Sequence, residues 1–221
     1  MSETGLRGRW LWNQLLSPDL ERSMRYYCAL FGWRQETYHG AGEPYRFWTA
    51  NGEPIGGALQ QPAGAKGPPS WLGYLGTADV DRSVRRALEG GGRILRDATE
   101  VPTVGRFAVL ADPWGAAFAV YRPLSGQAPP VEASAVGEFC WHELATGDVE
   151  GALGFYGRLF GWKPGRSAEE GGPGALRLYE RMGHARGSVR KLDGGSRDGA
   201  WLHSVRVASL EEAVERAQGH G

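Results

Sequence analysis

Two histidines and one glutamate are the side chains best suited to chemistry in this 221-residue sequence. His142 and His203 occupy matched positions in two similar segments, and Glu143 directly follows His142. Imidazole is a common ligand of transition metals. A carboxylate in an apolar setting has its pKa raised by desolvation and can act as a general base. The hypotheses are therefore a metal enzyme that uses His142 and His203, or a lyase or isomerase that uses Glu143. A structural role is the alternative for each residue.

Other catalytic and binding motifs are missing from the sequence. It contains no glycine loop followed by Lys-Ser/Thr, no G-x-S-x-G, no H-E-x-x-H and no basic run interleaved with aromatic residues. The 25 basic side chains balance 25 acidic ones, so no net charge attracts nucleic acid or anionic lipid. No apolar run approaches the ~18 residues of a membrane span, and the N-terminus lacks a secretion signal. We expect a cytoplasmic protein with a small-molecule ligand and neither nucleic acid nor membrane as partner.

The chain repeats itself at a spacing that changes by only one residue along the repeat. The matched residues include rare tryptophans, whose repeated agreement chance does not explain. The pairs are Trp12 with Trp141, Tyr27 with Tyr156, Leu30-Phe31-Gly32-Trp33 with Leu159-Phe160-Gly161-Trp162, and, after one inserted residue, Trp71 with Trp201. The sequence is therefore a tandem duplication.

Each copy divides into smaller units. An aromatic-rich strand over Gly8–Leu16 leads to Ser17-Pro18-Asp19, which has the residues of a helix start. Apolar residues at helical spacing follow up to Gly32. Three short strands come next, at about 34–39, 45–50 and 54–60, and a second such unit starts at Trp71. The predicted fold class is α+β: βαβββ units that form curved mixed sheets with helices on the outside.

The second copy stops early. After the predicted strand Trp201–Val207 and helix Leu210–Gln218, nothing corresponds to Gly92–Arg122 of the first copy. We predict a first domain over 8–123, a linker over 124–136, and a second domain over 137–221 whose fourth unit lacks three strands. An open sheet edge favours association, so a homodimer through this edge, and a non-catalytic dimerising module, are further hypotheses.

Several motifs resemble those of the vicinal oxygen chelate superfamily, which includes glyoxalase I, bleomycin-resistance proteins and extradiol dioxygenases. They are the Leu-Phe-Gly-Trp helix ends, Asp112-Pro113-Trp114-Gly115, and the segment Trp141-His142-Glu143-Leu144-Ala145-Thr146-Gly147-Asp148, which is similar to the tandem actinobacterial type. The resemblance implies that pairs of units form a cup, which in the enzymes holds a divalent metal.

The resemblance also implies where metal ligands would lie. The positions on first strands are Trp12 and Leu72 in the first copy and Trp141 and Leu202 in the second, and the final-strand position is Ala119. None of these side chains has a lone pair suited to a transition metal. We predict that the first cup binds no metal and that the protein uses no cofactor.

An aromatic pocket is the remaining candidate site. Side chains alternate across a strand, so residues two positions from the metal-ligand positions share their face. A filled core is the alternative. The predicted ligand-binding residues, for a small aromatic or amphipathic molecule, are Trp12, Gln14, Trp48, Leu72, Tyr74, Ala119, Tyr121 and Trp141.

Overall fold

A computed structural model describes residues 5–40, 43–62, 64, 68–124, 134–167, 176–192 and 199–220. Most of the predicted linker over 124–136 lies outside these residues. The helices are α1 (Leu20–Phe31), α2 (Val80–Glu89), α3 (Val149–Phe160) and α4 (Leu210–His220). The strands are β1 (Trp10–Ser17), β2 (Arg34–Tyr38), β3 (Tyr45–Ala50), β4 (Glu53–Gln60), β5 (Ser70–Gly76), β6 (Arg93–Val101), β7 (Gly105–Ala111), β8 (Ala117–Pro123), β9 (Phe139–Thr146), β10 (Lys163–Ser167), β11 (Arg177–Arg181), β12 (His184–Lys191) and β13 (Ala200–Val205).

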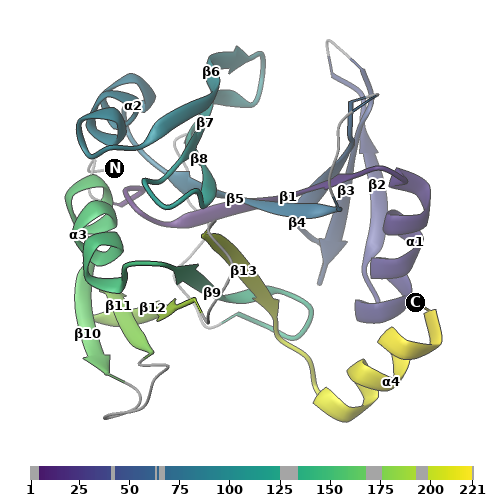
Figure 1. The fold of residues 1–221 in the computed structure, drawn as a ribbon. Helices are drawn as coiled ribbons and strands as arrows, with labels where there is room; N and C mark the ends of the chain where they lie inside the picture. The colour runs from purple at the N-terminus through teal and green to yellow at the C-terminus, as the bar shows by residue number, and fades with distance from the viewer. Residues whose placement is uncertain are drawn as a thin grey trace. The chain divides into compact units, whose positions relative to one another are not determined.

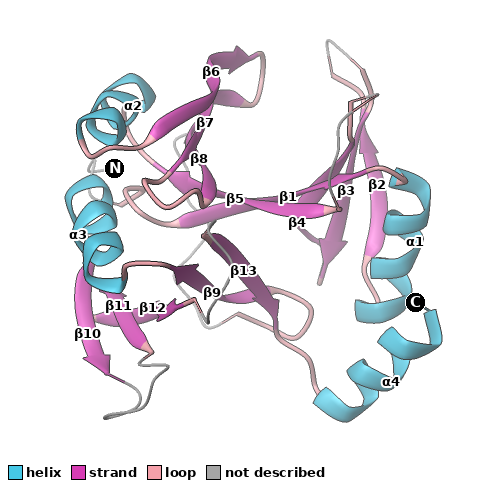
Figure 2. Cartoon of the chain, in the orientation of Figure 1, coloured by secondary structure: helices cyan, strands magenta, loops and turns pink. Residues whose placement is uncertain are grey.

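The strand–helix–three-strand order occurs three times in full, and β13 and α4 follow (Figure 1). The strands form two mixed sheets, in the orders β2-β3-β4-β1-β5-β8-β7-β6 and β10-β11-β12-β9-β13. Within the repeated units the first strand pairs in parallel with the last, as β1 does with β4 and β9 with β12. Four strands separate each helix from the next along the described chain, and Figure 2 shows helices and strands in separate colours. The predicted α+β fold class is confirmed.

The chain divides into two compact units. Unit 1 comprises Met1–Leu11, Gly73–Pro130 and Trp141–Leu202, and unit 2 comprises Trp12–Leu72, Val131–Cys140 and His203–Gly221. Each unit therefore combines segments of both sequence copies. Strands β1, β5, β9 and β13 contribute residues to both units.

The helix boundaries follow from local sequence. Asp19 and Asp148 precede α1 and α3, and their carboxylates accept the backbone N–H of Arg22 and Gly151, which satisfies a free donor at each helix start. Both helices end at a glycine with positive φ, 71° at Gly32 and 74° at Gly161. Glycine adopts this conformation without steric cost. The two copies thus define their first helices in the same way.

Each unit has its own core, and the helix-facing strand residues supply it. In unit 2, Leu15 of β1, Met24 of α1 and Trp48 of β3 are fully or almost fully buried together. In unit 1, α2 and α3 pack on a larger set of buried residues that includes Leu75, Phe118 and Leu144. Because side chains alternate along a strand, the residues between these positions lie on the opposite sheet face.

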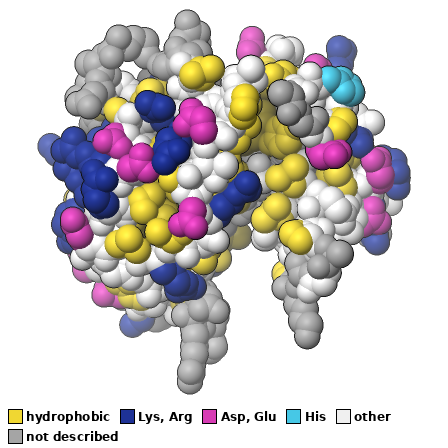
Figure 3. Space-filling model, turned by 90° about the horizontal axis from the view of Figure 1, so that it is seen from above, with side chains coloured by type: hydrophobic (Ala, Val, Ile, Leu, Met, Phe, Trp, Pro, Cys, Tyr) yellow, Lys and Arg dark blue, Asp and Glu magenta, His cyan; other side chains and the backbone are white. Residues whose placement is uncertain are grey.

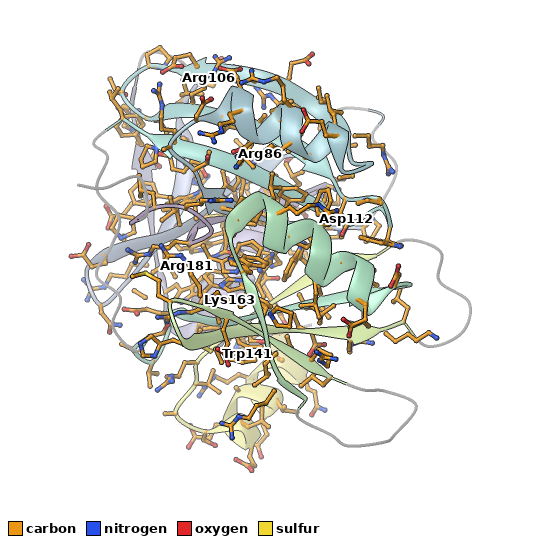
Figure 4. All side chains as sticks on the ribbon, turned by 90° about the vertical axis from the view of Figure 1, so that its left-hand side faces the viewer. Arg86, Arg106, Asp112, Trp141, Lys163 and Arg181 are labelled. Atoms are coloured by element: carbon orange, nitrogen blue, oxygen red, sulfur yellow. The ribbon has the colours of Figure 1, made fainter. Side chains whose placement is uncertain are left out.

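An indole–phenol hydrogen bond recurs in both units. Trp71 Nε1 donates to the Tyr27 hydroxyl at 2.9 Å in unit 2, and Trp201 Nε1 donates to the Tyr156 hydroxyl at 3.0 Å in unit 1. In unit 1 the Tyr156 hydroxyl also donates to Asp112 at 3.1 Å. Asp112, labelled in Figure 4, is fully buried, and burial raises the pKa of its carboxyl.

Helix α4 exposes apolar side chains that its counterpart buries. Leu210 is 67% exposed, whereas Val80 at the start of α2 is 2% exposed. In unit 2, α4 lies beside α1, and Arg216 Nε donates to the Leu30 carbonyl at 3.1 Å (Figure 1). None of the helices in the described part of the chain is long and apolar enough to cross a bilayer.

Candidate functional site

In unit 2, Trp12, Tyr45 and Gln14 form a hydrogen-bonded cluster on the sheet face opposite α1. Trp12 Nε1 donates to the Tyr45 hydroxyl at 3.0 Å, and that hydroxyl donates to Gln14 Oε1 at 3.5 Å. The face follows from alternation, since the neighbouring Leu15 is buried against Met24 of α1. We call these three residues the Trp12 cluster.

Tyr45 is a residue that the sequence reasoning missed. It lies at the start of β3, where the register against β1 was not predictable from spacing. Its hydroxyl lies against Gly57 of β4, which pairs with Gln14, and a side chain at position 57 would collide with it. The absence of a side chain at Gly57 is the available signal, because glycine within a strand often marks close approach by another group.

Unit 1 carries the matching set from the second copy, on β9 and β12. Trp141 Nε1 donates to Ser188 Oγ at 3.1 Å, and Ser188 Oγ donates to Glu143 Oε2 at 3.1 Å. Arg190 Nε donates to Glu143 Oε1 at 2.7 Å. We call these four residues the Trp141 cluster; Figure 4 labels Trp141 within unit 1. The hypothesis that placed Glu143 in an apolar setting is corrected, because each of its oxygens accepts a hydrogen bond and a guanidinium faces it.

A second group of predicted residues lies in unit 1, on the sheet face opposite α2. Tyr74 and Ala119 are paired in the sheet, and the Tyr74 ring lies 5.7 Å from Phe107 and 6.1 Å from Tyr121. The Tyr121 hydroxyl donates to the Val104 carbonyl at 3.0 Å, and burial raises its pKa. The structure thus brings Tyr74, Ala119 and Tyr121 together within unit 1.

Trp48 does not belong to these faces. Its side chain is 0% exposed in the unit 2 core, and its Nε1 lies 3.4 Å from the carbonyl of Met24 in α1, to which it donates. The inclusion of Trp48 among ligand-binding residues was therefore wrong, because β3 turns this side chain toward the helix. Leu72, also in unit 2, is 7% exposed.

The two histidines are packed among aromatic rings. His142, in unit 1, is 6% exposed and stacks on Trp10 with ring centroids 4.3 Å apart. His203, in unit 2, lies edge-on to Phe139 at 6.5 Å, and burial lowers its pKa to about 4. Burial favours the neutral imidazole of His203, and both histidines contribute to packing.

The side chains at the expected metal positions do not fit a divalent metal. Two of these positions carry an indole, Trp12 in unit 2 and Trp141 in unit 1. The other two carry alkyl side chains, Leu72 in unit 2 and Ala119 in unit 1. The two indole N–H groups are donors already bonded to Tyr45 and Ser188. Among the described residues, no three or more His, Cys, Asp or Glu side chains are grouped so that they could hold a metal ion.

Basic and acidic side chains both lie on the face drawn in Figure 3. Lysine and arginine side chains are interspersed there with aspartate and glutamate, and apolar side chains lie between them. Ion pairs such as Arg46 with Glu21 in unit 2 and Arg177 with Glu150 in unit 1 follow the same pattern. This distribution agrees with the balanced formal charge.

Comparison with known proteins identifies the family. The family model of the Glyoxalase/Bleomycin resistance protein/Dioxygenase superfamily matches residues 11–120. The chain belongs to this superfamily. It is 30% identical over 154 residues to the putative glyoxylase CFP32 of Mycobacterium tuberculosis, and 33% identical over 176 residues to the anthracycline biosynthesis protein DauV of Streptomyces sp. strain C5. These matches cover 68% and 72% of this chain but only 59% and 63% of those relatives.

Solved structures of low sequence identity share the fold. A mutant of 4-hydroxymandelate synthase from Streptomyces coelicolor aligns with a TM-score of 0.64 and 13% identity, over 97% of this chain and 75% of that one. The Mn(II)-bound glyoxalase from Novosphingobium aromaticivorans aligns with a TM-score of 0.63 and 13% identity, over 97% of this chain and 70% of that one. At this identity the likeness shows the fold alone.

Proposed function

We propose that this superfamily member binds a small planar aromatic molecule at the Trp12 cluster of unit 2, and that it does so without a metal. The observation that supports this most directly is that Trp12 lies where the resemblance implies a metal ligand, and its indole N–H donates to the Tyr45 hydroxyl. A fixed indole offers a flat apolar surface, and tyrosine and glutamine add polar groups that orient a ligand.

The hydrogen bonds of the cluster determine what it offers a ligand. Tyr45 accepts from Trp12 and donates to Gln14, so the ring of Trp12 is restrained at its N–H edge. A planar ligand would stack on the indole face, beside the polar side chains of Tyr45 and Gln14. Gln14 takes no proton at neutral pH, so the cluster supports binding rather than acid–base catalysis.

The relatives support the ligand class. One of them is named an anthracycline biosynthesis protein, and anthracyclines are planar and polycyclic. We therefore choose a neutral planar polycyclic ketone as the probe, and a saturated analogue of similar size as the control ligand.

The test is a calorimetric titration of the full chain with the planar probe. We expect saturable binding that Trp12→Ala weakens by about tenfold or more, since loss of a stacked aromatic anchor costs about 2 kcal/mol. Tyr45→Phe removes only the hydroxyl and should weaken binding less. Tyr26→Phe, in α1 on the opposite side of the sheet, is the matched control and should bind as the parent chain does.

Two results would contradict the proposal. One is probe binding that Trp12→Ala leaves unchanged while the variant remains folded by circular dichroism. The other is purified protein that contains near-stoichiometric Mn, Fe, Ni or Zn and loses probe binding when that metal is removed.

A further inference from the structure

The Trp141 cluster of unit 1 differs from the Trp12 cluster in charge. Register pairs Glu143 with Ser188 in the second copy and Gln14 with Gly57 in the first. Two residues further along the last strand, the second copy has Arg190 and the first has Leu59. The same strand pairing therefore carries an ion pair in one copy and neutral side chains in the other.

The ion pair is not required by the fold. The first copy forms the same parallel pairing of β1 with β4 while its equivalent positions are uncharged. The Glu143 and Arg190 side chains are only 25% and 33% exposed. Partial burial of two charges costs desolvation free energy that their attraction offsets only in part. The pair therefore points to a role other than stability.

Arg190 retains donors that can face a ligand. Its Nε is bonded to Glu143, and no hydrogen bond of its two Nη groups to any residue of the described chain is present. A guanidinium binds a carboxylate through two parallel N–H groups in a planar fork. Trp141, linked to Glu143 through Ser188, supplies a restrained aromatic ring in the same cluster.

From these contacts we infer a second ligand site, in unit 1, for an aromatic carboxylate. Arg190 binds the carboxylate and Trp141 packs against the ring, while Glu143 is a positioning residue that fixes the guanidinium through Nε. This site is independent of the Trp12 cluster, since the residues, the unit and the charge of the ligand all differ.

The experiment is calorimetric titration of the full chain with three ligands of equal ring size: naphthoate, naphthalenemethanol and naphthylmethylammonium. We expect naphthoate to bind most tightly. Arg190→Leu, which introduces the residue of the first copy, should weaken naphthoate binding by about tenfold or more. Glu143→Gln should preserve or increase it, because the glutamine Oε1 can still accept from Arg190 Nε while a competing negative charge is removed.

Arg177→Leu is the matched control. Arg177 forms an ion pair of similar length with Glu150, at 2.8 Å, on the neighbouring strand β11. This variant should bind naphthoate as the parent chain does. Addition of salt should weaken naphthoate binding and leave the binding of the neutral planar ketone at unit 2 almost unchanged.

Three outcomes would overturn the inference. They are no naphthoate binding at millimolar concentration, binding that Arg190→Leu leaves intact, and a preference for the cationic ligand that Glu143→Gln abolishes. The last would make Glu143 the recognition group. Failure of the Trp12→Ala test with success here would overturn only the proposed function, and the reverse result would overturn only this site.

Discussion

The Trp12 cluster and the Trp141 cluster hold an indole in the same way with different residues. In unit 2 the hydroxyl that accepts the indole N–H comes from Tyr45 of β3, and in unit 1 it comes from Ser188 of β12. In both, that hydroxyl donates to residue 14 or 143. The hydroxyl therefore occupies the same place in both clusters. The residue that supplies it differs, and so does the charge of the neighbouring side chains.

A second difference concerns the tyrosine of the repeated indole–phenol hydrogen bond. In unit 1 the Tyr156 hydroxyl donates to the buried Asp112, which also accepts the backbone N–H groups of Trp114 and Ala116. Unit 1 thus has a buried carboxylate that joins the turn before β8 to α3.

Removal of this carboxylate should have the largest effect. Asp112→Ala leaves two backbone donors and one hydroxyl without their acceptor in a buried site, and should lower the free energy of unfolding by about 3 kcal/mol. Chemical denaturation measures this. Asp81→Ala, which removes a carboxylate more than half exposed in the same unit, should cost less than about 0.5 kcal/mol. Equal losses for the two variants would contradict the network.

The next difference is His203, which stands where the first copy has Gly73. Burial lowers its pKa to about 4, below the ordinary value of about 6.5. The folded state therefore favours the neutral imidazole. The contribution of His203 to the free energy of unfolding is fully present above pH 6.5 and is lost as the pH falls toward 4, because the unfolded chain then binds a proton that the folded chain does not. From pH 7.5 to 4.5 the loss in the free energy of unfolding should be about 2–3 kcal/mol.

Denaturation of the parent chain and of His203→Gln across this pH range isolates that contribution. The difference in stability between the two should change in favour of the variant as pH falls. A constant difference over the range would show that His203 is not buried as described.

The two hydroxyl sources can be exchanged. Gly57→Ser alone should destabilise the chain by about 2 kcal/mol, because the new side chain collides with the Tyr45 hydroxyl. The double variant also carries Tyr45→Leu, because leucine is the residue at the equivalent position before Arg177 in the second copy. The double variant should recover most of the lost stability, because the introduced serine hydroxyl accepts the indole N–H of Trp12. Thermal unfolding of both single variants and of the double variant gives the coupling free energy between positions 45 and 57. Strictly additive effects would contradict the equivalence of the two clusters.

The smallest effects are expected where the copies agree. Arg46 with Glu21 and Arg177 with Glu150 are equivalent ion pairs with well-exposed acidic partners. Arg46→Leu and Arg177→Leu should each change the free energy of unfolding by less than about 0.5 kcal/mol. A loss above about 1 kcal/mol at only one of them would show that the copies differ here also.

The sequence predicted the fold because its signals are local and occur twice. Asp19 and Asp148 start helices, and Gly32 and Gly161 end them, whatever lies elsewhere in the chain. Alternation also predicted that Gln14 shares a face with Trp12. The partners of these residues depend on register between strands, and spacing does not determine register. Tyr45 and Arg190 were therefore missed, and Trp48 was assigned to the wrong face of a strand that contains a register shift. The homodimer through the open edge stays a prediction.

Titration of the planar ketone into chelator-treated full chain, repeated with added Mn(II), tests most directly whether the Trp12 cluster binds its ligand without a metal. We predict the same affinity in both conditions, and a loss of about tenfold or more in Trp12→Ala in both. Binding that appears only with Mn(II), and that Trp12→Ala does not change, would contradict the account.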